Sequence, residues 1–190
     1  MEHRGEGSRL NNVPDSVVEQ IMSCFGSLDE PTFFFLKEDW RRSMYHGFLG
    51  ELAATLLQDM DNLFSISNVT DLNADHCLVL RVDGVQGWIL ELSFVGRFAA
   101  LFRIVPHSIQ EIFQPDLTAA LPAERIFVQL LRKHEIELLG PTVLEIPFHL
   151  RLFYTEPENG KVYQALFRDV DVLPWKRDLG TEGRTSPPPG

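Results

Sequence analysis

Apolar residues form three strand-like runs in the middle of the chain, between Cys77 and Ile104. The runs are separated by Asp83-Gly84 and Gly87 at the first break and by Gly96 at the second, residues that favour turns. This pattern predicts a three-stranded antiparallel meander over residues 77–104. Its main consequence is architectural, because it places a sheet between segments that have helical spacing.

A second sheet signal comes near the C-terminus. Asn159-Gly160 is a strong two-residue turn sequence, and it separates two apolar-rich runs at residues 151–156 and 161–167. The sequence therefore predicts a C-terminal hairpin over residues 151–167, with Trp175 packing back onto the fold.

Apolar residues recur at helical spacing in three other segments. They predict helices over residues 14–25, ended by Gly26, over 44–60 and over 122–134. Four shorter segments carry weaker signals: residues 136–139 predict a short strand, 108–113 a short helix, 64–69 a strand or an irregular lead into the meander, and 31–36 a strand or an extended plug.

Together these elements predict an α+β fold with a central, mainly antiparallel sheet packed by helices. Residues 13–175 are expected to form a single domain, since no linker or internal repeat interrupts them. The polar residues 1–12 and the proline-ended residues 176–190 are expected to be a flexible tail and a disordered tail.

The lengths of the two meander turns decide which residues share a face of the sheet. If both turns hold an odd number of residues, one face is continuously apolar and the other carries Arg81, Glu91 and Arg103. A two-residue turn at Asp83-Gly84 is the alternative, and it would mix the two sets. The odd register sorts apolar from polar residues better, and it predicts a polar cluster of Arg81, Glu91 and Arg103, either a charged site or a structural ion cluster.

The formal net charge is −10, and most of it lies ahead of the meander. Residues 13–75 hold 11 acidic and three basic side chains. Such a field repels nucleic acid and anionic membranes and attracts basic partners, although acidic helix faces can also serve solubility alone. The expected contact residues for a basic partner protein are Glu30, Glu38, Asp39, Glu51, Asp59 and Asp61.

In size, charge and fold class the chain is similar to small acidic bacterial immunity proteins, which mask basic toxins. The likeness implies a binding protein without catalytic activity, and we take this as the first functional hypothesis. Self-association into a homo-oligomer is a further option.

No motif for catalysis, phosphate binding or metal binding occurs in the sequence. The six histidines and two cysteines lack metal-ligand spacing, so neither a metal nor a cofactor is expected. No run approaches the ~20 apolar residues of a membrane span and no secretory signal is evident, which favours a cytoplasmic location. The alternative hypothesis is an enzyme or small-ligand binder with a pocket between sheet and helices, lined by Trp88, Phe102 and Phe48 with Glu91 or an arginine as polar anchor.

Overall fold

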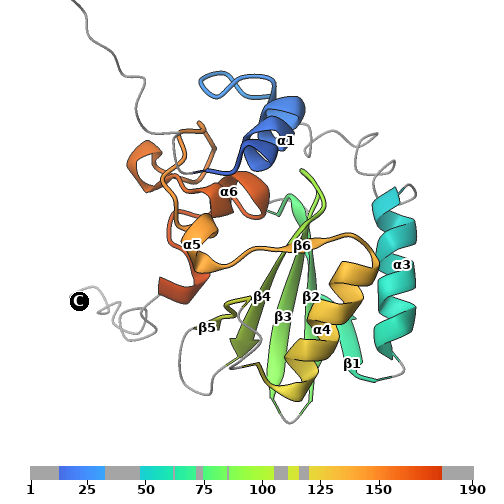
Figure 1. The fold of residues 1–190 in the computed structure, drawn as a ribbon. Helices are drawn as coiled ribbons and strands as arrows, with labels where there is room; N and C mark the ends of the chain where they lie inside the picture. The colour runs from blue at the N-terminus through green and yellow to red at the C-terminus, as the bar shows by residue number, and fades with distance from the viewer. Residues whose placement is uncertain are drawn as a thin grey trace, which may run out of the picture.

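The computed structural model describes residues 13–32, 48–61, 63–71, 75–84, 86–104, 111–115 and 120–176. The expected N-terminal tail, the C-terminal tail beyond Lys176 and most of the 31–36 segment lie outside these ranges. Figure 1 shows the resulting α+β arrangement, a twisted sheet with helices on both of its faces. The elements are, in chain order, α1 (Asp15–Phe25), α3 (Phe48–Asp61), β1 (Ser65–Asn68), β2 (Cys77–Asp83), β3 (Gly87–Ser93), β4 (Phe98–Ile104), β5 (Glu111–Ile112), α4 (Pro122–Lys133), β6 (Glu137–Leu138), α5 (Pro141–Leu144), η2 (Pro157–Asn159), α6 (Val162–Leu166) and η3 (Pro174–Lys176).

The six strands form one mixed sheet. Strands β1 to β5 pair in chain order and antiparallel, and β6 pairs parallel with β4. The predicted meander is therefore confirmed as β2, β3 and β4, and the short strand expected at 136–139 is β6. The segment at 64–69 contains β1.

Both faces of the sheet are covered, which gives three layers. On one face Leu80 and Leu90 pack in a cluster with Leu56 of α3 and Phe127 of α4. On the other face Val79 and Ile89 pack with residues of α1, α5 and α6, which lie on the opposite side of the sheet in Figure 1.

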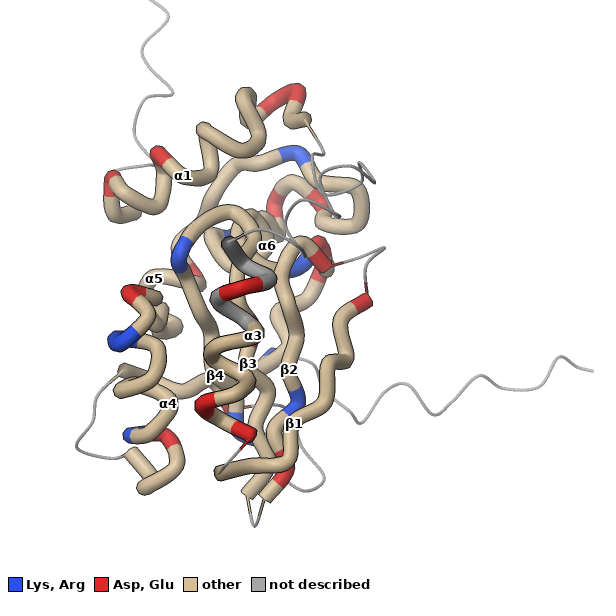
Figure 2. The backbone as a smooth tube through the Cα atoms, turned by 90° about the vertical axis from the view of Figure 1, so that its right-hand side faces the viewer, with Lys and Arg blue, Asp and Glu red and all other residues tan. Residues whose placement is uncertain are grey.

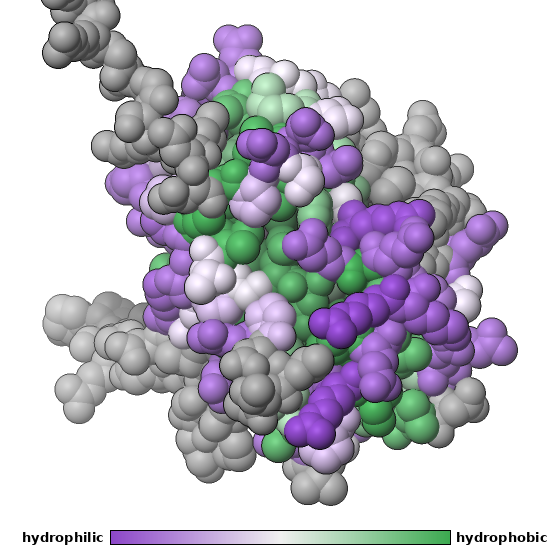
Figure 3. All heavy atoms as spheres, viewed as in Figure 1, coloured by the Kyte–Doolittle hydropathy of each residue, from purple (hydrophilic) through white to green (hydrophobic). Residues whose placement is uncertain are grey.

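Two helices show why the predicted helical segments fold as they do. In α1, Val17, Ile21 and Phe25 recur every fourth residue and are fully buried, and Gly26 ends the helix with a φ of 74°. In α4, Phe127, Val128 and Leu131 are buried, and all its polar side chains except that of Glu124 are exposed; Figure 3 shows a strongly hydrophilic band over this helix.

The predicted register of the second meander turn is wrong. The pairing of Val82 with Trp88 encloses five residues, as expected, but the pairing of Leu92 with Ala99 encloses six. Arg103 consequently lies opposite Trp88 and on the face away from Glu91. The physical reason is that helices cover both faces, so the sheet has no polar face against which apolar residues could be sorted.

The predicted hairpin over 151–167 is also wrong. Residues 157–159 form the 3-10 helix η2, and α6 begins at Val162. The backbone N–H groups of Phe153 and Tyr154 donate to the carboxylate of Asp169 instead of to a partner strand. The short helix expected at 108–113 is not formed at its described end, because residues 111–112 are β5 and pair with β4.

Candidate functional site

The three residues of the predicted polar cluster do not meet. Arg81 donates from Nε to Asp83 of its own strand, 2.9 Å away, with both side chains about half exposed. Arg103 faces α4, and Glu91 is buried on the opposite face. The predicted cluster is therefore wrong, because it required a register of β3 and β4 in which Arg103 and Glu91 share a face of the sheet.

Glu91 lies at the centre of the sheet in a buried polar network. Tyr163 of α6 donates its hydroxyl to Oε2 at 3.0 Å, and Arg168 Nη1 lies 3.7 Å from Oε1. Arg168 also donates from Nε to Asp75 at 2.6 Å. Burial raises the pKa of Glu91 to about 7, against the opposing effects of Arg168 and Tyr163. Glu91 and Tyr163 are both 0 % exposed and only Arg168 reaches the surface, with 28 % of its side chain exposed, so the network mainly joins the sheet to α6.

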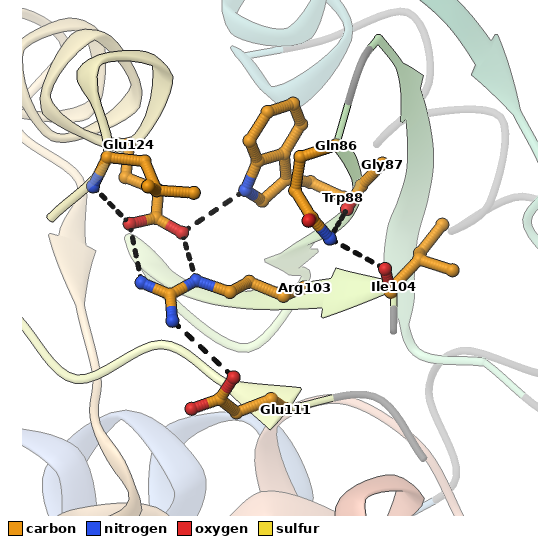
Figure 4. A network of polar contacts seen from close by, with 8 residues as sticks. Gln86, Gly87, Trp88, Arg103, Ile104, Glu111 and Glu124 are labelled. Carbon is orange, nitrogen blue, oxygen red and sulfur yellow. Dashed lines mark hydrogen bonds and ion pairs between the residues drawn. The ribbon is translucent and has the colours of Figure 1, made fainter. Parts of the chain in front are cut away.

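Arg103 forms a second network on the other face of the sheet, shown in Figure 4. Its guanidinium donates from Nη2 to Glu124 of α4 at 2.8 Å, and the indole of Trp88 donates to the same carboxylate at 3.3 Å. The N–H of Leu121 donates to Glu124 at 2.8 Å, which caps the start of α4. Burial alone would raise the pKa of Glu124, but these donors outweigh it and the pKa is lowered. The network fastens α4 to β3 and β4.

The predicted ligand pocket between sheet and helices is also not found as specified. Trp88 packs against Phe127 of α4 at a ring separation of 5.6 Å, whereas Phe102 stacks on Trp175, also at 5.6 Å, on the opposite face. The side chain of Phe48 lies outside the described residues. Trp175 does close the fold, as the sequence predicts.

A cavity of about 560 Å³ lies elsewhere, between α1 and the turn that joins β3 to β4. This volume is in the usual range of ligand pockets, roughly 300–1,000 Å³, and the cavity is widely open to solvent rather than enclosed. We call it the end cavity. Its described lining comes from three parts of the chain: Ser16, Glu19 and Gln20 of α1, then Phe94, Val95, Gly96 and Arg97 of the turn with Phe98 at the start of β4, and Glu135 and Glu137 around the start of β6.

The floor of the end cavity is apolar and firmly held. Phe94, Val95 and Phe98 are each less than 10 % exposed. Val95 donates its N–H to the hydroxyl of Ser93 at 3.0 Å, and that hydroxyl donates to the carbonyl of Leu166 in α6 at 2.6 Å. The turn is thereby tied to α6, and its shape is fixed before any ligand arrives.

Gly96 is required for the shape of this floor. A Cβ at Gly96 would lie 2.6 Å from the ring of Phe98, closer than side chains approach in folded proteins. The absence of a side chain lets the Phe98 ring lie directly under the turn.

The rim of the end cavity is acidic. Among its described lining residues it carries the carboxylates of Glu19, Glu135 and Glu137 against one guanidinium, that of Arg97, which is paired with Glu135. Glu137 donates its N–H to the carbonyl of Arg97 at 2.8 Å, so β6 holds the rim against the turn. The rim thus keeps a net negative charge after its internal ion pair is counted.

Glu135 occupies a backbone position that favours glycine. Its φ is 56°, the only positive φ of a non-glycine residue in the described ranges. The N–H of Glu135 donates to Arg132 and that of Ile136 to Leu131, at 3.0 and 2.8 Å, which is the Schellman ending of α4. A glycine would fit this ending at lower cost, and the sequence has a carboxylate there instead.

The acidic residues predicted to contact a partner are dispersed. Glu51 and Asp61 are exposed on α3, whose acidic positions face the viewer in Figure 2. Asp59 accepts from Lys133 at 2.6 Å and lies 3.4 Å from His134, and these hydrogen bonds lower its pKa. Glu30 is exposed in the turn after α1. Glu38 and Asp39 lie outside the described residues.

Sequence reasoning missed most of the end cavity. Glu19 belongs to the acidic segment 13–75 but stood out no more than its neighbours, and Glu135 and Glu137 lie far downstream. The only available signal was their position on either side of Ile136 at the start of the predicted strand 136–139. Nothing local indicates that α1 packs beside them.

Neither the arrangement of the described residues nor comparison with known proteins identifies a function for this site. Within the described ranges, no three or more His, Cys, Asp or Glu residues are arranged to hold a metal ion, and no helix has the length and apolar character needed to cross a bilayer. No family model, no curated protein and no solved structure matches the chain.

Proposed function

We propose that the protein is a non-enzymatic binding protein that masks a basic surface of a partner protein, with the end cavity as its contact site. The observation that carries this proposal is the combination of an apolar floor with an acidic rim. Lysine and arginine have the complementary build, an aliphatic stem that packs on apolar surface and a cationic head that needs carboxylates or water.

The charge of the whole chain supports the same class of partner. A net charge of −10 accelerates encounter with a basic surface and disfavours acidic competitors, nucleic acid and anionic membranes. The cytoplasmic location expected from the sequence belongs to this proposal too. Preformed geometry supports binding further, because the floor and rim are already fixed by hydrogen bonds to α6 and β4.

The test uses a peptide of alternating glycine and arginine as the basic probe. Replacing Glu135 by Gly and Glu137 by Gln removes two rim carboxylates, and Glu135→Gly does so without backbone strain because of the positive φ. We expect this double variant to bind the peptide about tenfold more weakly, a loss of ~1.4 kcal/mol, and with a weaker dependence on salt. Isothermal titration calorimetry at low and moderate ionic strength measures both effects.

A matched control removes two carboxylates from α3. The variant Glu51→Gln with Asp61→Asn makes the same change in net charge, two units less negative than −10, but leaves the end cavity intact, so it should bind almost as the wild type does. If the α3 variant loses the larger part of the affinity, the contact lies on the surface predicted from the acidic segment and the cavity proposal is wrong. A citrulline peptide of the same length controls for contacts that need no charge.

A further inference from the structure

Two neighbouring aromatic side chains stand out on the surface. Phe153 is 60 % and Tyr154 is 65 % exposed, more than any other large apolar side chain in the described part of the chain. Large exposed aromatic pairs mark contact sites more often than isolated apolar residues do. We call this pair the aromatic ledge.

The backbone beneath the aromatic ledge is held by a buried carboxylate. Asp169 is 3 % exposed, and it accepts hydrogen bonds from the N–H of Phe153 at 2.7 Å, the N–H of Tyr154 at 3.1 Å and the hydroxyl of Thr155 at 2.8 Å. These bonds hold the backbone that carries the two rings. A backbone fixed in this way lowers the entropy that binding would otherwise cost.

Carboxylates lie on both sides of the aromatic ledge. On one side Glu156 and Asp171 are exposed and joined by a hydrogen bond from the Glu156 N–H, at 2.9 Å. On the other side the N–H of Arg151 donates to the carbonyl of Leu28 at 3.0 Å, which brings the turn with Asp29 and Glu30 against the start of the loop. Arg151 is itself exposed and His149 Nε2 lies 3.3 Å from Asp29, so among the described residues around the ledge the carboxylates outnumber the cationic groups but are not alone.

We infer that the aromatic ledge is a second contact site, on which arginine side chains of the basic partner stack. The inference rests on the proposed function and adds a preference for arginine. A guanidinium stacks on an aromatic ring and pairs with a nearby carboxylate at the same time, whereas the ammonium of lysine is compact and more strongly hydrated. A second copy of this chain is a less suitable occupant, because two chains of net charge −10 would bring like charges together.

The test compares two probes of equal length and charge, an alternating glycine–arginine peptide and an alternating glycine–lysine peptide. We expect the wild-type chain to bind the arginine peptide about three- to tenfold more tightly. In the variant Phe153→Leu with Tyr154→Leu this ratio should fall to about one, although apolar area and the backbone bonds to Asp169 are kept. The end-cavity variant Glu135→Gly with Glu137→Gln should weaken both peptides and preserve the ratio.

The outcomes separate the two proposals. If the ratio of the affinities for the arginine and lysine peptides is the same in the leucine variant as in the wild type, the proposal for the aromatic ledge is wrong and the proposal for the end cavity is unaffected. Loss of the ratio in the leucine variant, with no effect of the end-cavity variant, supports the ledge and overturns the cavity. Failure of both peptides to bind the wild type overturns both proposals. Self-association of the wild type that the leucine variant abolishes, measured by sedimentation, overturns arginine as the occupant.

Discussion

Replacing Arg103 by Met should lower the free energy of unfolding by about 3–5 kcal/mol, one of the largest effects expected for any single substitution in this chain. The carboxylate of Glu124 is 0 % exposed, and Arg103 supplies its only cationic partner among the contacts described. Without the guanidinium, a buried charge would keep only the donors of Trp88 and Leu121. Urea unfolding near neutral pH measures the loss.

The pair can be tested by a double-mutant cycle. Glu124→Gln alone leaves Arg103 with its exposed partner Glu111, 3.4 Å away, and the arginine side chain is 24 % exposed and can be solvated, so the loss should be smaller. Combining Arg103→Met with Glu124→Gln should recover part of the stability, because no buried charge is left, although the single amide oxygen replaces only one of the two carboxylate oxygens that accept from Trp88 and Leu121. If the two single losses simply add, the buried ion pair is not what fastens α4 to the sheet.

Glu91 should make stability fall as the pH rises toward neutrality. Its pKa in the folded chain, about 7, lies above the ordinary value of 4.5, so its contribution is complete below pH 4.5 and is lost as the pH passes through 7. The penalty at alkaline pH is roughly 3 kcal/mol. Tyr163, Arg168 and Asp75 face this carboxylate, and the desolvation of the ionised form outweighs the attraction of Arg168.

His76 has the opposite effect on the pH dependence of stability, so it must be separated from the effect of Glu91. Burial lowers its pKa to about 4 from 6.5, so its contribution is complete above pH 6.5 and is lost as the pH falls through 4. The two effects offset each other between pH 4.5 and 6.5. The effect of Glu91 is therefore measured as the difference in the free energy of unfolding between the wild type and Glu91→Gln. The contribution of His76 is the same in both proteins and cancels.

We expect the free energy of unfolding of Glu91→Gln to increase relative to that of the wild type as the pH rises from 5 to 9, by up to about 3 kcal/mol. Urea unfolding across this range measures the difference directly. Tyr163→Phe is a useful companion, because it removes one hydrogen bond to Glu91 but leaves the titrating group in place. A difference between wild type and Glu91→Gln that is independent of pH would show that Glu91 is ionised in the folded chain throughout.

The sequence was sufficient for the elements whose signals are local. The meander, the helix ended by Gly26 and the helix predicted over 122–134 depend on spacing within one segment, and all three are confirmed, the last as α4. Spacing within one segment could not show whether the turn before Phe98 holds an odd or an even number of residues. Both faces of the sheet are buried, so either register places apolar residues inside. The hairpin failed because Asp169 and Asp171, beyond the turn, accept the hydrogen bonds that a partner strand would have accepted.

The candidate site was harder to predict than the fold, because its parts are distant in the sequence. Glu19 and Glu137 are separated by more than half of the chain and meet only through the packing of α1 against the β3–β4 turn. The prediction of a basic partner from the net charge stays a prediction, and the net charge gave no place of contact. Among the residues chosen for their charge, Asp59 is already paired with Lys133.

The most direct measurement of the central proposal is a map of backbone amide shifts in the isotope-labelled chain, titrated with the glycine–arginine peptide. We expect the largest and saturable changes at Gly96, Arg97 and residues 135–137, with a smaller second group at Phe153 and Tyr154. Changes concentrated on α3, from Glu51 to Asp61, or no saturable change at the end cavity, would contradict the proposal that this cavity is where the protein meets a basic partner.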